Sequence, residues 1–358
     1  MPGGTPLFQI HLKSASPSDR DAAVARLRVW ADEHGTRLVE PAEGPGGQPA
    51  PVYMESLPEP ELADALAALP GVARVEAVQA RGRLVEGAAA RTVAIGPARF
   101  GGGEASFIAG PCAVEHEERL VALAKRLRDA GAAALRGGAF KPRTSPYGFQ
   151  GLGRRGLEML STASAASGLP VVTEVLDPRD LELVCRHAQV LQVGSRNMSN
   201  SALLQEVGRA GLPVLLKRGM SATLDEFLYA AEYVALGGCQ DILLCERGLR
   251  HFDPAVRNLL DLSAVPALKQ RTGLPVIVDP SHGTGRASLV APMIAAAAAA
   301  GADGFLVEVH AAPADAWSDG AQALSPDAFA AATERADAVL AACGRRLARA
   351  TETATPER

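Results

Sequence analysis

The sequence predicts an α/β fold, a TIM (β/α)8 barrel preceded by a small α+β ferredoxin-like domain. From residue 106 onward, a short apolar run followed by a helical pattern recurs about eight times, as in a closed barrel of parallel strands. Before it, residues 7–80 follow the order strand, helix, strand, strand, helix, strand, the split pattern of ferredoxin-like domains. We therefore expect a domain over residues 1–80, a connector over 81–104 and a catalytic barrel over 105–350.

Local signals place the elements of the N-terminal domain. Leu7–Leu12 alternates like a strand, and Ser16 with Pro17 supplies a cap and a first helical proline for a helix that ends near Gly35. Two strands, a helix and a strand follow, over residues 36–41, 52–57, 59–69 and 72–78. Glycine- and alanine-rich runs in residues 81–104 predict a flexible connector with one short strand at 92–95.

Short apolar runs supply the predicted barrel strands, at 106–109, 134–136, 171–174, 190–193, 214–217, 242–245, 276–278 and 305–309. Helix-start signals support the spacing, because Asp177 precedes a proline, Thr223 and Glu226 form a capping-box pattern, and Ser325 precedes Pro326. In such barrels the active site forms at the C-terminal ends of the strands, where the polar residues of this chain concentrate.

Composition argues against several classes of protein. The chain has 358 residues, 47% of them hydrophobic, and a formal net charge of −4, so nucleic acid is not expected as a partner. The N-terminus lacks the basic and apolar runs of a secretory signal, and the apolar helix predicted at 287–300 is too short to span a membrane. The five cysteines form no CxxC pair, which indicates reduced thiols and a cytoplasmic location.

Four side chains that suit a metal ion lie at or after predicted strands. Cys112 follows the first strand, His282 follows the seventh, and Glu308 and Asp319 lie at and beyond the eighth. Because strand ends meet at one mouth of a barrel, a thiolate, an imidazole and two carboxylates can reach one ion. This mixed donor set suits a catalytic divalent transition metal better than a closed structural zinc site. We expect one divalent ion, such as Mn, Fe, Co or Zn.

Cations also gather at predicted strand ends. The loop after the second strand carries Arg136, Lys141 and Arg143 among glycines and a hydroxyl group. Arginine binds phosphate or carboxylate with two parallel hydrogen bonds, so this loop suits a phosphorylated, carboxylated substrate. Further cations follow other strands, namely Arg196, Lys217, Arg218 and Arg247. Their convergence implies more than one negative group on the substrates.

Each of these residues also has a structural interpretation. Cys112 alone is more often a small buried hydrophobe, His282 a hydrogen-bonded core histidine, and Asp319 a turn residue. Glu308 alternates with its apolar neighbours along its strand, which points it into the barrel, and each cation could be a solvated strand end. Their joint position at one face of the predicted barrel favours a catalytic site.

Six motifs resemble those of 3-deoxy-D-arabino-heptulosonate 7-phosphate (DAHP) synthases. In chain order they are Ala-Gly-Pro-Cys, Leu-Arg-Gly-Gly-Ala-Phe-Lys-Pro-Arg-Thr-Ser-Pro, Leu-Leu-Lys-Arg-Gly, Leu-Cys-Glu-Arg-Gly, Val-Asp-Pro-Ser-His and Val-Glu-Val-His. The resemblance covers roughly residues 105–345. Within the family, the sequence resembles the branch that is related to 3-deoxy-octulosonate 8-phosphate synthase. The N-terminal unit resembles the regulatory domain of some members. One departure is the run 283–285, Gly-Thr-Gly, where the family pattern leads us to expect serine and glycine.

The resemblance implies a reaction and residue roles. The family condenses phosphoenolpyruvate with erythrose 4-phosphate and releases phosphate, at the entry to the shikimate pathway of aromatic amino acid biosynthesis. By motif, the metal ligands are Cys112, His282, Glu308 and Asp319, and the phosphoenolpyruvate-binding cations are Arg136, Lys141, Arg196, Lys217 and Arg247. The stretch that meets erythrose 4-phosphate is Lys141, Pro142, Arg143 and Thr144. We assign catalytic roles to Lys141 for proton transfer, to Glu174 for handling water and to His282.

Other functions remain as alternatives. The octulosonate 8-phosphate synthase runs the same chemistry on arabinose 5-phosphate, but its signature resembles Lys-Ala-Asn-Arg, whereas this chain has Lys-Pro-Arg-Thr. A non-catalytic regulatory or scaffolding subunit would be expected to lack a metal ligand, and a fused chorismate mutase would bring long helices. We also expect a homo-oligomer, a tetramer or dimer, and an aromatic amino acid as a possible effector of residues 1–80.

Overall fold

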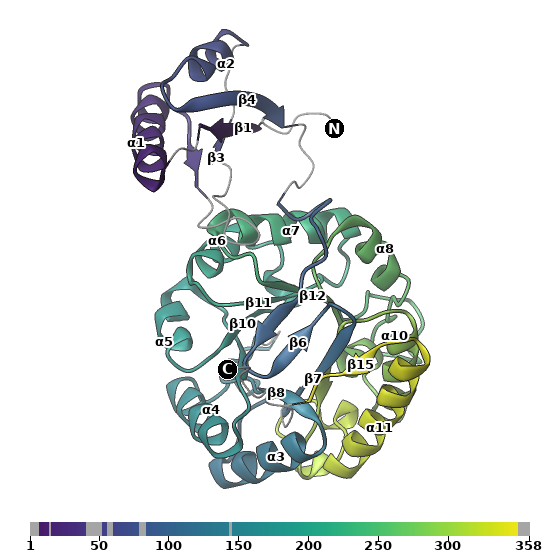
Figure 1. The fold of residues 1–358 in the computed structure, drawn as a ribbon. Coiled ribbons are helices and arrows are strands. Elements are labelled where there is room, and N and C mark those ends of the chain that lie inside the picture. The colour runs from purple at the N-terminus through teal and green to yellow at the C-terminus, as the bar shows by residue number, and fades with distance from the viewer. Residues whose placement is uncertain are drawn as a thin grey trace, which may run out of the picture.

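The computed structural model describes residues 7–13, 16–40, 52–55, 60–78, 84–142 and 145–349. Its main body is a closed parallel barrel (Figure 1). Neighbouring strands pair in chain order, and the last pairs in parallel with the first, which closes the sheet. The strands are β7 (Glu104–Gly110), β8 (Ala132–Arg136), β9 (Val171–Glu174), β10 (Val190–Val193), β11 (Val214–Lys217), β12 (Ile242–Glu246), β13 (Val276–Val278) and β14 (Gly304–Glu308). The predicted strands are confirmed, each end within two residues of its expected position.

Helices surround the barrel, and their starts follow the expected caps. They are α3 (Glu117–Asp129), α4 (Arg154–Ser167), α5 (Leu181–Cys185), α6 (Ser201–Arg209), α7 (Leu224–Gly237), α8 (Ala264–Arg271), α10 (Ala287–Ala299) and α11 (Pro326–Ala342). Thr223 and Glu226 form the capping box of α7, and Ser325 caps α11. Asp177 instead caps a 3-10 turn that precedes α5. Within the described residues, no helix has the length and apolar character needed to cross a membrane.

A β-hairpin closes the N-terminal end of the barrel. Strands β5 (Val93–Ile95) and β6 (Ala98–Phe100) pair antiparallel and lie across the barrel end in Figure 1. Val93, Ile95 and Phe100 are buried in one apolar cluster with inward-facing residues of the barrel strands, among them Ile108 and Leu306. A short strand, β15 (Arg346–Leu347), pairs with the start of β7 at the same end.

The expectation of a flexible connector is wrong for its described part. Backbone N–H groups of Leu84 and Val85 each donate to the carboxylate of Glu232 on α7, at 3.1 Å. Glu86 pairs with Arg271 at the end of α8. These contacts bind the segment to the barrel, because two backbone donors and an ion pair are satisfied by barrel side chains.

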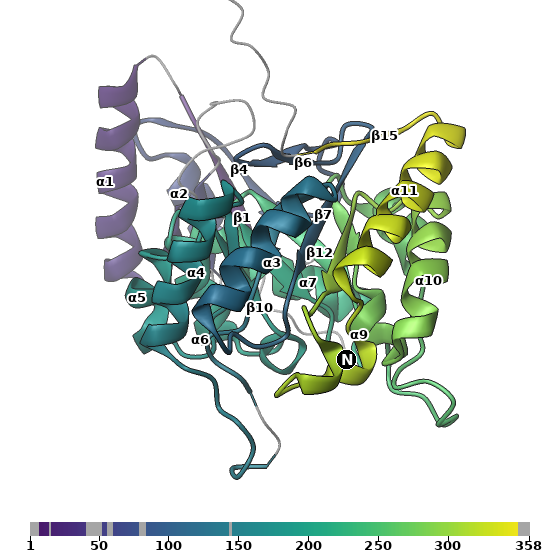
Figure 2. The same ribbon diagram turned by 90° about the horizontal axis from the view of Figure 1, so that it is seen from below.

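The N-terminal sheet has ferredoxin-like topology. Its strand order is β2-β3-β1-β4, and its pairings are antiparallel. The elements are β1 (Leu7–Leu12), α1 (Pro17–Glu33), β2 (Leu38–Val39), β3 (Val52–Glu55), α2 (Pro60–Ala67) and β4 (Val72–Val78). The sheet lies beside the barrel near α6 and α7 (Figures 1 and 2). Val39 and Tyr53 pack there against Leu84 and Leu236.

Candidate active site at the C-terminal mouth of the barrel

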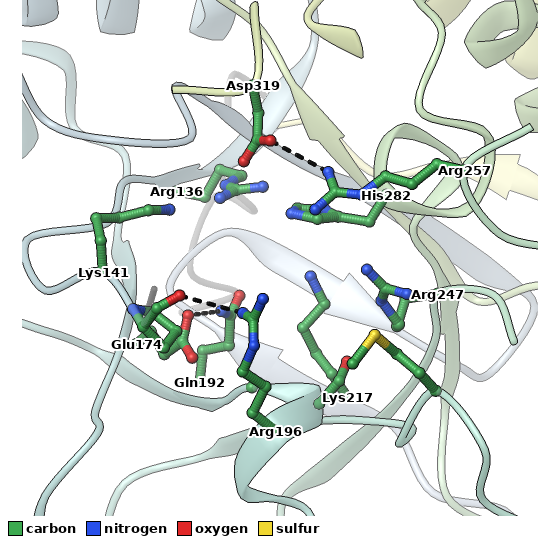
Figure 3. A pocket seen from close by; sticks show the side chains of 14 residues that line it. Arg136, Lys141, Glu174, Gln192, Arg196, Lys217, Arg247, Arg257, His282 and Asp319 are labelled. Atoms are coloured by element: carbon green, nitrogen blue, oxygen red, sulfur yellow. Dashed lines mark hydrogen bonds and ion pairs between the residues drawn. The ribbon is translucent and has the colours of Figure 1, made fainter. Parts of the chain in front are cut away.

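A polar cavity of about 200 Å³ opens at the C-terminal ends of the strands (Figure 3). Its wall is rich in cations, and carboxylates and an imidazole complete it. The lining residues are Arg136, Lys141, Pro142, Glu174, Gln192, Gly194, Ser195, Arg196, Lys217, Met220, Arg247, Arg257, His282 and Asp319. A cavity with so many fixed cations suits a substrate with several negative groups.

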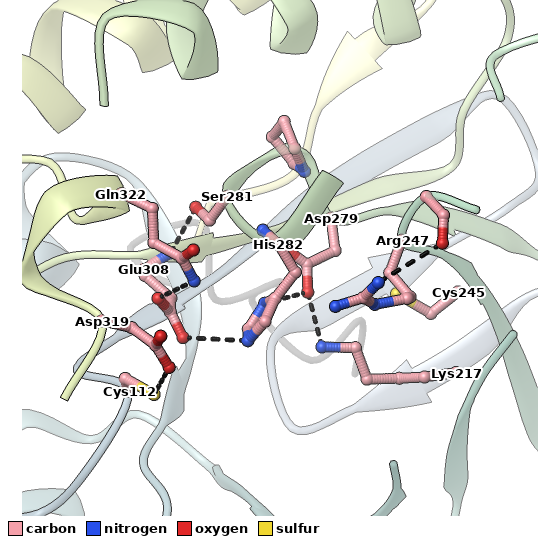
Figure 4. Close-up of polar contacts among 12 residues, drawn as sticks. Cys112, Lys217, Cys245, Arg247, Asp279, Ser281, His282, Glu308, Asp319 and Gln322 are labelled. Carbon is pink, nitrogen blue, oxygen red and sulfur yellow. Dashed lines mark hydrogen bonds and ion pairs between the residues drawn. The ribbon is translucent and has the colours of Figure 1, made fainter. Parts of the chain in front are cut away.

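The four predicted metal ligands come together beside this cavity. Cys112 follows β7, Glu308 ends β14, His282 lies in the short helix α9 (Pro280–Thr284), and Asp319 lies in the loop after β14. One ligand atom from each of them lies within 4.8 Å of the others (Figure 4). Barrel closure explains the gathering of residues that are far apart in sequence, because β14 pairs with β7.

The hydrogen bond of His282 to Asp279 leaves the lone pair of its Nε2 directed toward Glu308, in the cluster of four donors. Its Nδ1 lies 2.7 Å from Asp279 Oδ2, and a carboxylate only accepts, so Nδ1 carries the proton. Burial lowers the pKa of His282, although the charge of Asp279 opposes this, which favours the neutral ring. Its Nε2 then faces Glu308 Oε1 at 3.3 Å, acceptor against acceptor. A cation between these atoms would turn a repulsive contact into two bonds, so the residues fit a bound metal.

Cys112 also fits a metal ion. Burial, followed by the charge of Glu308, raises the pKa of its thiol to about 12. The thiol donates to Asp319 Oδ2 at 3.0 Å and accepts from Lys141 Nζ at 2.9 Å. A thiol in this setting becomes a thiolate when a bound divalent cation supplies positive charge. Thiolate, imidazole and carboxylates together suit a transition metal of the Mn to Zn series.

Ion pairs hold two of the cations rigidly. Arg136 Nη1 lies 3.1 Å from Glu308 Oε1, and Lys217 Nζ lies 2.5 Å from Asp279 Oδ2. Burial alone would raise the pKa of Asp279, but its interactions with His282 and Lys217 hold it well below its ordinary value. Asp279 thus stays ionised and orients both the histidine and the lysine.

Within the described part of the chain, two other cations have only uncharged hydrogen-bond acceptors. Arg247 is buried and donates to the carbonyl of Gly248 at 3.3 Å, and Arg196 donates to the carbonyl of Pro142 at 3.2 Å. Burial lowers the pKa of Arg247, with only partial opposition from the charge of Asp279. Because their hydrogen-bond acceptors are neutral, both guanidinium groups can attract an anion.

Glu174 lies across the cavity from His282 and Asp319 in Figure 3. Its Oε2 accepts from Gln192 Nε2 at 3.2 Å, and a Cβ at Gly194 would come within 2.0 Å of its Oε1. Glycine at 194 therefore makes room for the carboxylate. Burial raises the pKa of Glu174, while Lys141 and Lys217 oppose the shift. A carboxylate with a raised pKa is a stronger base than an ordinary one, which suits a group that accepts a proton.

The structure thus brings together the predicted residues that it describes. Arg143 and Thr144 lie outside the described residues. Sequence reasoning missed Asp279, Gln192, Arg257 and Gln322. Gln322 donates to Glu308 Oε2 at 2.6 Å, and Arg257 bonds both Asp319 and Gln322. Asp279 could have been found, because it stands three residues before His282 at a strand end.

One predicted cation has a structural role instead. Arg218 is buried and pairs with Glu246 at 2.8 Å and with Asp261 at 3.0 Å. Its Nε also donates to the carbonyl of Ala222. With two carboxylates and a carbonyl as partners, Arg218 ties the loops after β11 and β12 together.

The fold and site define an enzyme class, barrel enzymes that bind anionic substrates beside a set of metal-binding donors. Within that class, the profile of the DAHP synthetase I family matches residues 87–340. The chain belongs to this family.

Individual relatives agree with this assignment. The phospho-2-dehydro-3-deoxyheptonate aldolase of Thermotoga maritima is 50% identical over 235 residues, which cover 66% of this chain and 70% of the relative. A crystal structure of this Thermotoga maritima aldolase, which is also named DAHP synthase, matches with a TM-score of 0.74 and 38% identity. The match covers 96% of this chain and all of that one. The structure of a truncated form of the Thermotoga maritima synthase matches with a TM-score of 0.70 and 43% identity. The match covers 74% of this chain and 99% of that one. A 2-dehydro-3-deoxyphosphooctonate aldolase of Acidithiobacillus ferrooxidans is 32% identical over a match that covers 61% of this chain and 83% of the relative.

Proposed function

We propose that this chain is a DAHP synthase that condenses phosphoenolpyruvate with erythrose 4-phosphate and water, and releases inorganic phosphate. The observation that carries the proposal is the cation-lined cavity directly beside the Cys112, His282, Glu308 and Asp319 cluster. The two substrates bring two phosphates and a carboxylate to one site. This amount of negative charge requires several fixed cations, and the cavity provides them.

The cations divide between the two substrates. We assign phosphoenolpyruvate to the cations at the strand ends, namely Arg136, Lys141, Arg196, Lys217 and Arg247. Arg196 is exposed, whereas the other four are buried. Burial in a water-poor wall strengthens the attraction of these four for the phosphate and carboxylate. Erythrose 4-phosphate is assigned to Lys141, Pro142, Arg143 and Thr144, where the last two rest on the sequence motif alone.

One divalent ion would be held by Cys112, His282, Glu308 and Asp319. When bound, such an ion supplies Lewis acidity to a carbonyl oxygen of the substrate. Lys141 supports the same atom, because its Nζ lies 2.9 Å from the Cys112 sulfur and so borders the cluster. We assign it the proton transfer to the aldehyde oxygen.

The remaining bond changes involve the side of the cavity that carries Glu174. The methylene carbon of phosphoenolpyruvate forms a bond to the aldehyde carbon, and water then adds to the enol carbon. Breaking the C–O bond of the resulting hemiketal phosphate releases phosphate. Glu174, held by Gln192, is placed to position the water and to take its proton.

The test is phosphoenolpyruvate consumption with either sugar phosphate, before and after chelation. We expect turnover with erythrose 4-phosphate, loss of turnover in chelator and recovery on adding a divalent ion such as Mn²⁺. Undiminished turnover in a preparation shown to be metal-free would overturn the metal assignment.

The second candidate is octulosonate 8-phosphate synthesis. The observation that favours it is the identity of 32% with the Acidithiobacillus aldolase. The Lys141-Pro142 motif and the higher identity of 50% with the Thermotoga relative favour the four-carbon sugar. Preferred consumption of arabinose 5-phosphate in the same assay would reverse this choice.

We further propose that residues 1–80 respond to an aromatic amino acid and that the enzyme works as a homo-oligomer. Support comes from the ferredoxin-like sheet, whose described residues Val39 and Tyr53 meet Leu236 of the barrel. A domain that contacts a barrel in this way can shift position when a ligand binds one arrangement more tightly.

A further inference from the structure

Glu115 is a nearly buried carboxylate that the proposed mechanism does not use. It stands three residues after Cys112, in the loop between β7 and α3, and its side chain is 6% exposed. Its Oε1 accepts from the backbone N–H of Trp317 at 2.7 Å, and its Oε2 lies 3.2 Å from His310 Nε2. One side chain thus joins the Cys112 loop to the loop after β14, which carries Asp319.

The contact with His310 has a defined direction. A carboxylate only accepts, so His310 Nε2 must donate to Glu115. His310 Nδ1 in turn faces the backbone of Ala312, at 2.7 Å from its oxygen and 3.1 Å from its nitrogen. Glu115 therefore holds the loop near both of its ends, at His310 and at Trp317.

One residue of this loop has a backbone conformation that non-glycine residues seldom adopt. Asp319 has a φ of 56°, the only positive φ of a non-glycine residue among those described. Non-glycine residues persist in the left-handed region when their surroundings fix them, and such residues gather at functional sites. The next residue, Gly320, packs so tightly that a Cβ there would lie 2.2 Å from the carbonyl oxygen of Pro313.

The Trp317 side chain extends this connection to a third loop. Its ring meets His116 edge-on at 5.2 Å and Phe149 at 5.1 Å. Phe149 belongs to the loop after β8, which also carries Lys141 and Pro142. The backbone of Trp317 is fixed by Glu115, so one carboxylate stabilises the neighbourhood of both the ligand cluster and the substrate loop.

We propose that Glu115 is a positioning residue that fixes the loop 310–319 so that Asp319 reaches the metal together with Cys112. This inference rests on the proposed function, because it assumes that the cluster binds a metal. Outer groups that orient ligands change metal affinity by about 10- to 100-fold when removed. We expect Glu115→Ala to weaken Mn²⁺ binding by a factor in that range.

The experiment measures Mn²⁺ affinity and the fluorescence of Trp317 in the full chain. Trp30 and Trp317 are the two tryptophans of the sequence, so a Trp30→Phe background isolates the signal from Trp317. Glu115→Ala should weaken Mn²⁺ binding and shift Trp317 emission to longer wavelength as its backbone anchor is lost. Glu118→Ala is the matched control, because Glu118 is an exposed carboxylate at the start of α3. It should change neither signal.

Two further variants keep the inference testable if Glu115→Ala does not fold. Glu115→Gln retains an amide oxygen for the Trp317 N–H, so it should recover much of the affinity. Glu115→Asp keeps the charge but shortens the reach, so it should still weaken binding. Unchanged Mn²⁺ affinity and emission in a folded Glu115→Ala or Glu115→Asp protein would overturn the inference and leave the proposed function intact. Failure of the unsubstituted protein to bind Mn²⁺ would overturn both.

Discussion

The two ends of the barrel are built from the same strands but in opposite ways. At the N-terminal end, the β5–β6 hairpin packs Val93, Ile95 and Phe100 against inward-facing aliphatic side chains, and this cluster is apolar. At the C-terminal end, buried cations and carboxylates such as Arg136 and Glu308 pair with one another around a cavity. The apolar end gains stability from burial, whereas charges such as Arg136 and Glu308 tolerate burial at the other end because they pair with each other.

Because of this difference, substitutions at the two ends should affect different properties of the protein. Removing atoms from the apolar end should lower stability and leave the chemistry of folded molecules intact. Removing a polar group from the charged end should change ligand binding and turnover with less effect on folding. Two buried cysteines provide the sharpest comparison, since Cys112 belongs to the donor cluster and Cys245 to the apolar cluster.

The largest effect is expected for Cys112→Ala. It should lower metal occupancy and turnover by orders of magnitude while the fold is retained, because the substitution removes a proposed ligand at the barrel mouth. Cys245→Ala is the control and should keep both properties. Metal content by mass spectrometry and steady-state turnover measure the two variants. Equal, small effects on metal content would show that Cys112 is a packing residue.

At the opposite end, Phe100→Ala should lower the free energy of unfolding by about 3–5 kcal/mol, as for other buried phenylalanines. Phe100 is fully buried against Gly304 and its neighbours. Denaturant unfolding measures the loss, and turnover per folded molecule should stay unchanged. Arg99→Ala, at an exposed position of the same strand, should have little effect on either quantity. Lost turnover in folded Phe100→Ala would show that the two ends are coupled.

Within the charged end, the two substrate regions should separate in their kinetics. Arg143→Ala should raise the KM for erythrose 4-phosphate more than that for phosphoenolpyruvate, and Arg247→Ala should do the reverse. A rise of roughly tenfold to a hundredfold corresponds to losing a hydrogen bond to a charged group. Initial rates with each substrate varied in turn give both constants. The opposite ordering would mean that the two substrate sites are exchanged.

The smallest effect on catalysis is expected from removing the N-terminal domain. Because Leu84, Val85 and Glu86 bond to the barrel, the truncated chain should begin at residue 84, so that these contacts remain. It should keep its turnover and lose inhibition by tyrosine or phenylalanine, which in the full chain should be about fivefold or more. Inhibition assays at millimolar amino acid measure this. Indifference of the full-length enzyme to both amino acids would make the domain an assembly or stability element.

Local signals in the sequence determined the elements and much of the site. Apolar runs placed the strands, and caps such as Thr223 and Ser325 placed helix starts, because both act over a few neighbouring residues. The donor residues Cys112 and His282 followed from the rule that barrel strand ends converge. The ferredoxin-like order of the N-terminal elements was also predictable, since it requires only element types in sequence.

Tertiary structure alone decided which side chains meet. The hairpin β5–β6 closes the barrel because its apolar face matches the strand interiors, which nothing near Val93 or Phe100 in the sequence reveals. The bond of Glu115 to Trp317 joins residues that are 202 positions apart, and Arg257 reaches Asp319 over 62 positions. The first contact depends on the pairing of β14 with β7, which closes the barrel. The second depends on β13, which places the loops after β12 and β14 close to each other.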